Sequence, residues 1–162
     1  MPTGPVSHCD GKVNPMNAPC SIIIPLIKEF LQLGSCVRMT ATGSSMWPFL
    51  RNGDIIEISS IGNLPVRPGE IVLAIHRERY LLHRVIQINM RGIFIAGDAQ
   101  SYFQGPIAPD MVLGRVVALQ RGSALLKLNR LHWRIVGCVW AKTFPLGPRL
   151  INVFYRIYVK IR

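Results

Sequence analysis

The chain has 162 residues, of which 49% are hydrophobic, and this length and composition suit one domain with a buried core and an appended segment. Its net charge of +11 is unevenly placed, because residues 1–110 carry nine Lys/Arg and all eight acids, whereas residues 111–162 carry ten Lys/Arg and no acid. A basic tail of this kind fits an anionic membrane surface better than nucleic acid, which is not an expected partner because the chain has no helix-turn-helix, zinc-finger or RNA-binding signature.

Residues 1–20 are rich in Pro, Gly and polar side chains and lack the charged-then-apolar layout of a signal peptide, so a disordered leader is expected there. The run SIIIPLIKEFLQLG that follows predicts a short helix, with Pro25 in its first turn and Gly34 at its end. This run is too short and too charged to span a membrane, and no other stretch is long enough to be a transmembrane helix.

Short strand-like segments follow this helix, separated by turn signals such as Asn52-Gly53 and Arg121-Gly122-Ser123. Many short strands at close spacing predict a mainly β, mostly antiparallel fold of barrel-like or sandwich type. The predicted strands are Val37–Thr42, Asp54–Ile58, Glu70–Ile75, Tyr80–Ile88, Gly92–Ala96, Val112–Gln120 and Ala124–Leu128.

A boundary is expected near residue 130, where HWRIVGCVWAKTF turns helical, which divides the chain into a leader at 1–20, a β domain at 21–130 and a basic amphipathic tail at 131–162. The last stretch, PRLINVFYRIYVKIR, fits an interfacial helix with an apolar stripe opposite Arg149, Arg156 and Lys160. This predicts peripheral membrane contact through residues 131–162. Two alternatives stay open: a helix packed on its own domain, and a strand over FYRIYVKI.

The four cysteines share no C-x-x-C spacing, and no histidine stands at a zinc-like interval from a pair of them. They are interpreted as buried or incidental thiols. Neither a metal nor a cofactor is expected.

The stretch GSSMWPFLRNGDIIEIS, residues 43–59, places two adjacent serines in a Gly-flanked turn followed by Met46, Trp47 and Pro48. An ordinary loop does not need this bracing, whereas a nucleophile does. A serine is a poor nucleophile at its free pKa, so a nearby base must take its proton.

His83 is the candidate base among the four histidines, because it lies mid-strand in YLLHRVIQI, on the same strand face as Leu81 and Val85. A lone histidine on an apolar strand face is more often a satisfied core residue than a catalytic one. Its interpretation therefore depends on the segments around it.

Five segments follow one another along the chain: GSSMWPFLRNGDII, RPGEIVLA, LLHRVIQI, IFIAGDAQ and VLGRVVA. In this order they resemble the signal peptidase I family and its wider serine-protease clan, which includes self-cleaving SOS-type repressors. The resemblance covers about residues 37–120 and implies an antiparallel β domain of that type. In it, Ser45, the serine just before Met, matches the nucleophile, and His83 matches the general base. That position is typically Lys in bacterial members and His in endoplasmic-reticulum, archaeal and some sporulation-type members, so the chain resembles the His-type subgroup.

A histidine base needs a group that orients it, and the resemblance makes Asp98, in AGDAQ, the first candidate. In His-type members a second Asp lies several residues further on. Gln104 stands near that place in this chain and the next acid is Asp110, the second candidate. The alternative for Asp98 is a turn aspartate that caps its own backbone.

The resemblance also implies an altered oxyanion hole, because Gly43 stands where family members commonly have a serine donor. The backbone N–H of Ser45 can still donate to a developing oxyanion, and a contribution from Ser44 stays open. Asp54 is interpreted as part of a turn, and the arginines of the matching segments as surface or structural residues.

The resemblance implies a serine endopeptidase that cleaves after small residues in a precursor protein or peptide, extended along a strand edge at a membrane face. The basic tail would act as a peripheral anchor in place of the N-terminal transmembrane anchor of the family. The alternatives are a catalytically silent binding module of the same fold and a self-cleaving transcriptional regulator. The regulator would need a DNA-binding domain that the first 35 residues cannot hold.

Overall fold

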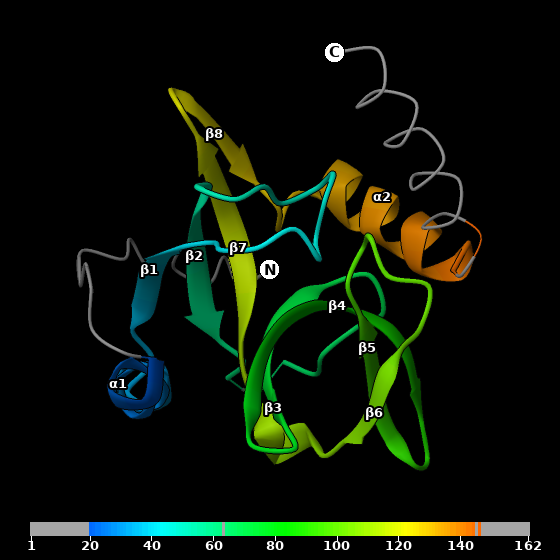
Figure 1. The fold of residues 1–162 in the computed structure, drawn as a ribbon, viewed down its shortest axis with the longest axis horizontal. Helices are drawn as coiled ribbons and strands as arrows, with labels where there is room; N and C mark the ends of the chain where they lie inside the picture. Colours follow the sequence, from blue (N-terminus) through cyan, green and yellow to red (C-terminus); the bar gives the residue numbers. More distant parts are fainter. Residues whose placement is uncertain (1–19, 63, 145, 147–162) are drawn as a thin grey trace, which may run out of the picture.

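The computed structural model describes residues 20–62, 64–144 and 146, and within them it confirms the expected mainly β fold (Figure 1). Eight strands form one sheet in the order β1-β2-β7-β3-β4-β5-β6, with β8 paired to β7, and every pairing is antiparallel. The strands are β1 (Cys36–Thr40), β2 (Ile55–Ser60), β3 (Ile71–His76), β4 (Arg79–Asn89), β5 (Gly92–Ala96), β6 (Gln104–Ile107), β7 (Val112–Arg121) and β8 (Ala124–Lys127).

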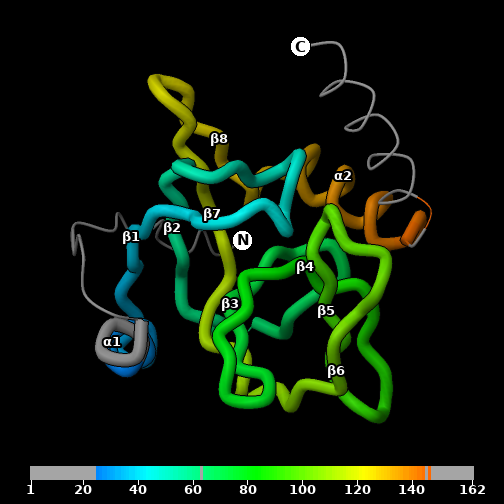
Figure 2. The backbone as a smooth tube through the Cα atoms, in the orientation of Figure 1, coloured from blue at the N-terminus to red at the C-terminus, as the bar shows by residue number. Residues whose placement is uncertain are grey.

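The sheet encloses two cores because β3 buries side chains on both of its faces. Ile71 and Leu73 pack into a first core, with residues of helix α1 (Cys20–Gln32), β1, β2 and β7. Val72 and Ala74 pack into a second core with residues of β4, β5 and β6. The strands β3 to β6 curl round until β6 approaches β3, as Figure 2 shows.

Seven of the strands lie where the sequence predicts them, and only β6 was not expected. Its sequence, QGPI, contains Gly and Pro, which normally argue against a strand. Proline is tolerated here because β6 lies at the edge of the sheet, where Ile107 pairs with Ile93 and Gln104 with Ile95.

Helix α1 confirms the predicted helix. It begins at Cys20, so Pro25 lies inside the helix and not in its first turn, where it was expected. Gly34 ends the helix as expected. It adopts a positive φ of 78°, and the N–H of Ser35 donates to the carbonyl oxygen of Phe30.

Helix α2 (Leu131–Lys142) begins at the expected boundary and packs directly on the β domain. A Cβ atom on Gly137 would lie 2.5 Å from the carbonyl oxygen of Gly69, so the helix approaches the sheet closely only because both residues lack side chains. Residues 131–142 are therefore part of the folded domain. Residues 1–19 of the expected leader at 1–20 and the amphipathic stretch at 148–162 lie outside the described residues, whereas Cys20 is the first residue of α1.

The cysteines do not all follow the expectation of incidental thiols. Cys36, at the start of β1, is disulfide-bonded, whereas Cys138 on α2 is a free thiol. Disulfides persist mainly in oxidising compartments.

Asp54 ties the chain after the serine turn to the end of β7. Its carboxylate accepts from Arg121 Nε at 2.9 Å, from Arg121 Nη2 at 2.7 Å and from the Arg51 backbone N–H at 2.7 Å. The Arg121 hydrogen bonds lower the pKa of Asp54 below 3.8, although burial acts in the opposite direction.

The Asp54→Asn protein is expected to have a free energy of unfolding about 1–2 kcal/mol lower at pH 7, because Arg121 is partly exposed and its ion pair is weakened by solvent. Since the folded-state pKa of Asp54 is depressed, its contribution is fully present above pH 3.8 and is lost as the pH falls through the folded-state value. Urea unfolding at pH 7 and at progressively lower pH checks this, with the half-buried Glu57→Gln as the control. An equal loss for both variants at pH 7 would contradict it.

Candidate functional site

The Ser45 turn is anchored in the first core, as the bracing in its sequence predicts. Met46 and Leu50 are buried there, and the Leu50 N–H donates to the Met46 carbonyl oxygen at 2.9 Å. Ser45 itself is half-buried, whereas Ser44 is exposed. The turn therefore holds Ser45 on a rigid support.

The backbone of Ser45 lies against the loop that follows β5. The Ala99 N–H donates to the Ser45 carbonyl oxygen at 2.8 Å, and a Cβ atom on Gly97 would lie 2.5 Å from that oxygen. Only glycine at position 97 permits this approach. The structure thus joins the Ser45 turn to the Gly97-Asp98 loop, two segments that the sequence analysis placed in one site.

His83 faces the second core, on the same face of β4 as Leu81 and Val85, as its strand position predicts. It is 4% exposed, and its Nδ1–H donates to Gln104 Oε1 at 2.9 Å. Burial lowers the pKa of His83 below 6.5, while the Gln104 hydrogen bond and the negative charge of Asp98 act in the opposite direction. Because this pKa is lowered, the ring is mainly neutral at pH 7, and no described residue is hydrogen-bonded to its Nε2.

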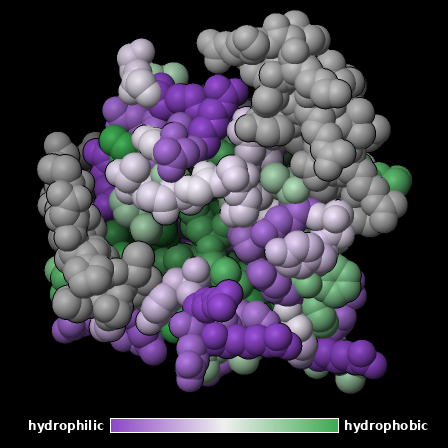
Figure 3. All heavy atoms as spheres, viewed as in Figure 1, coloured by the Kyte–Doolittle hydropathy of each residue, from purple (hydrophilic) through white to green (hydrophobic). Residues whose placement is uncertain are grey.

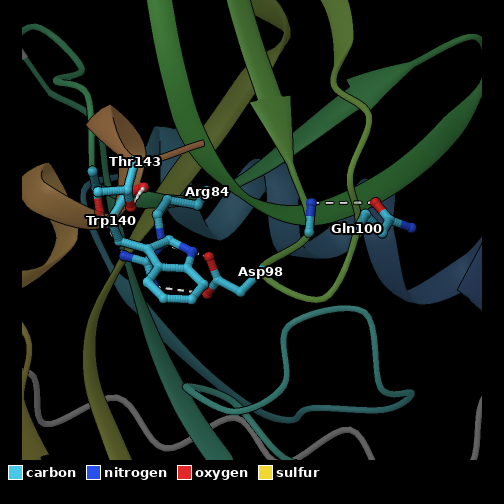
Figure 4. Close-up of polar contacts among 7 residues, drawn as sticks. Arg84, Asp98, Gln100, Trp140 and Thr143 are labelled. Atoms are coloured by element: carbon cyan, nitrogen blue, oxygen red, sulfur yellow. Dashed lines mark hydrogen bonds and ion pairs between the residues drawn. The ribbon is translucent and has the colours of Figure 1, made fainter. Parts of the chain in front are cut away.

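Asp98 is 1% exposed, and its carboxylate faces Arg84 (Figure 4). Its two carboxylate oxygens accept from Arg84 Nε and Nη2, each at 2.7 Å, and it also accepts a hydrogen bond from the Trp140 side chain. Burial raises the pKa of Asp98, and these hydrogen bonds and the Arg84 charge oppose the rise.

Asp98 therefore makes no hydrogen bond to His83 among the described residues, and strand alternation explains why. Neighbouring side chains on a strand point to opposite faces, so Arg84 and its partner Asp98 lie on the other side of β4 from His83. Gln104, on β6, is the orienting group instead. The second candidate, Asp110, is exposed on a single 3₁₀ turn at Pro109–Met111 and makes no ion pair with any described residue.

Ser45 and His83 are not hydrogen-bonded to each other in the described part of the chain. Arg84 pairs with Ala96 across β4 and β5, so His83 lies beside the start of the loop that contacts Ser45. Catalytic hydrogen bonds are often long in a free enzyme and shorten when substrate binds.

An aromatic and cationic cluster, which the sequence analysis missed, supports this loop. The Arg84 guanidinium carbon lies 4.7 Å from the centroid of the Phe49 ring, and that ring meets Trp140 edge-on at 5.1 Å. Arg84 Nη1 also donates to the Gly69 carbonyl oxygen at 2.7 Å. Arg84 is thus a buried structural residue that links the Ser45 turn, the Asp98 loop and α2.

No protein-family model matches the chain, and a search of curated proteins finds no match. Among the described residues, no group of three or more His, Cys, Asp or Glu side chains is arranged to hold a metal ion. None of the described helices combines the length and apolar character needed to cross a membrane.

Proposed function

We propose that the chain is a serine endopeptidase in which Ser45 Oγ attacks a peptide carbonyl and His83 Nε2 takes the serine proton. The observation that carries this proposal is the hydrogen bond from His83 Nδ1–H to Gln104 Oε1, because it fixes the tautomer whose Nε2 is a base. His83 then returns the proton to the leaving amine, and water hydrolyses the acyl-enzyme by the same route. Gln104 carries no charge, so stabilisation of the imidazolium depends on the more distant Asp98.

The substrate of this proposed enzyme is a precursor protein or peptide with small residues before the cut, as the resemblance to signal peptidases implies. Figure 3 shows apolar side chains at the centre of the face that carries the Ser45 segment, framed by hydrophilic ones. Such a surface supports binding of an extended peptide with small apolar side chains.

Peripheral membrane contact through residues 131–162 is part of the proposal. The α2 residues Leu131, Ile135 and Val139, spaced by four, are 70%, 54% and 55% exposed. The chain from residue 111 to its end contains no acid, and the exposed Arg130 and Arg134 make no ion pair within the described residues. An apolar stripe flanked by unpaired cations suits an anionic membrane surface.

A Val139→Ser protein is expected to bind anionic vesicles several-fold more weakly than wild type, because it removes one apolar side chain of the stripe. Co-sedimentation with phosphatidylserine-containing vesicles measures this, and neutral phosphatidylcholine vesicles provide the comparison. Failure of the wild-type chain to bind either kind of vesicle would contradict the membrane proposal.

The peptidase proposal predicts that Ser45→Ala and His83→Ala abolish the same set of proteolytic products. The products are new protein N-termini, identified by mass spectrometry in cells that express each form of the chain. Ser101→Ala and His132→Ala, which alter exposed residues of the same types, are the matched controls and should keep the wild-type set. Identical sets from the wild type and both site variants, with all proteins folded, would contradict the proposal.

A catalytically silent binding module is the second candidate function. Two observations favour it: among the described residues no hydrogen bond joins Ser45 to His83, and the group that orients His83 is an uncharged amide. A Ser45→Ala protein that retains full biological function would support this candidate.

A further inference from the structure

One cavity of the described residues is lined by neither of the proposed catalytic residues. It has a volume of about 1170 Å³ and lies between α2 and the sheet, beside the β2–β3 connection and the β7–β8 hairpin. Neither Ser45 nor His83 lines it. Its volume exceeds the usual range of small-molecule pockets, about 300–1,000 Å³.

The wall of this cavity is mainly apolar. Aliphatic side chains come from all the surrounding elements and include Leu64, Ile71, Val116, Leu126, Leu128 and Val136. Leu64 and Val136 are exposed at its edge although both are aliphatic. The cavity is thus an apolar space that opens to solvent, which suits an acyl chain more than a polar metabolite.

The charges around the cavity are almost entirely positive. Glu70 is the only acid among the described residues that line it, and Glu70 is paired with Arg115 at 3.0 Å. Three further cations, Arg67, Arg134 and Lys142, are exposed at the cavity, and their side chains make no ion pair within the described residues. An anion at the opening would therefore meet cations that have no ion-pair partner in the described part of the chain.

We propose that this cavity binds a lipid with a single acyl chain that ends in an anionic headgroup. The chain lies among the aliphatic residues between α2 and the sheet, and the headgroup lies near Arg134 in the first turn of α2, with Arg67 as a second cation of the same cavity. The charge of the opening selects an anion over a neutral lipid of the same length. This binding does not depend on the proposed peptidase reaction, because neither Ser45 nor His83 lines the cavity, although Phe49 and Arg84, which support the Ser45 turn, do.

The test is calorimetric titration of the full chain with oleate below its micelle concentration. Saturable binding of one oleate per chain is expected, with oleyl alcohol, the neutral compound of equal chain length, binding at least tenfold more weakly. Oleoyl lysophosphatidate is the third probe. If it binds more tightly than oleate, a phosphate headgroup is the natural source of the charge, and if it binds more weakly, a carboxylate is.

Two matched pairs of variants locate the binding. Val136→Trp fills the cavity and should weaken oleate binding at least tenfold, whereas Val139→Trp, on the same helix but outside the cavity, should not. Arg134→Glu should weaken binding at least tenfold, whereas Arg130→Glu, also exposed but outside the cavity, should have little effect. Circular dichroism confirms that each variant is folded.

Absence of saturable binding, or equal binding of oleate and oleyl alcohol, would overturn the proposal. Equal loss in Val136→Trp and Val139→Trp would also overturn it, since it would indicate adsorption to the outer face of α2. The Ser45→Ala protein should bind oleate as the wild type does. A failure of the peptidase proposal therefore leaves this result intact, and the reverse also holds.

Discussion

The Gln104→Leu protein is expected to lose about 10²- to 10⁴-fold in cleavage rate if His83 is the general base. Leucine has a similar size but cannot accept a hydrogen bond from Nδ1–H, so the ring loses the hydrogen bond that fixes its tautomer and orientation. The rate is measured as kcat/KM on a peptide that spans a cleavage site identified in cells. Gln87→Leu, an exposed glutamine on β4, is the control and should retain full activity.

A Gln104→Glu protein separates a catalytic imidazole from a merely structural one. Burial lowers the pKa of His83 in the wild type, so the acidic limb of its kcat/KM profile should lie below pH 6.5. A carboxylate at position 104 stabilises the imidazolium, so the pKa of His83 rises and the limb moves to higher pH. A limb that stays in place in the folded Gln104→Glu protein would contradict the assignment of His83 as the base.

Most of the fold could be predicted from local patterns, because turn residues and β-branched runs mark seven of the eight strands. The exception, β6, is held by its pairing with β5 although its own sequence, QGPI, has little strand propensity. The missed strand also carries Gln104, which stands near the place of the family's second Asp but was passed over because an acid was expected there. The pairing of β6 with β5, which no local pattern specifies, forms this strand and brings Gln104 to His83.

The role of Asp98 illustrates a different limit of sequence analysis. Sequence position places Asp98 in the loop after β5 but does not show which face of the neighbouring strand its carboxylate meets. The structure shows that this face carries Arg84 and that Trp140, from the helix beyond the β domain, completes the contact. Such a partner set depends on how α2 packs, which no local pattern in the sequence specifies.

The Arg84→Met protein is expected to lose about 3–5 kcal/mol of its free energy of unfolding, which is a large share of the stability of a small domain. The substitution leaves the Asp98 carboxylate buried without its cation and removes the contacts of Arg84 with Phe49 and the Gly69 carbonyl. Urea unfolding followed by circular dichroism measures the loss. Arg115→Met breaks the pair with Glu70 and the hydrogen bonds to the Ile61 and Leu64 carbonyl oxygens, and should cost about 1–3 kcal/mol, less than Arg84→Met because the Glu70 carboxylate keeps contact with water.

The double variant Arg84→Met/Asp98→Asn should be more stable than the sum of the two single losses predicts, because it no longer buries an unpaired charge. Additive losses would contradict the idea that this pair acts as a unit. The double variant also tests the link to the Ser45 turn, whose carbonyl oxygen accepts from Ala99 in the Asp98 loop. If the folded double variant still cleaves slowly, the pair positions Ser45, and if cleavage recovers together with stability, the role of the pair is structural alone.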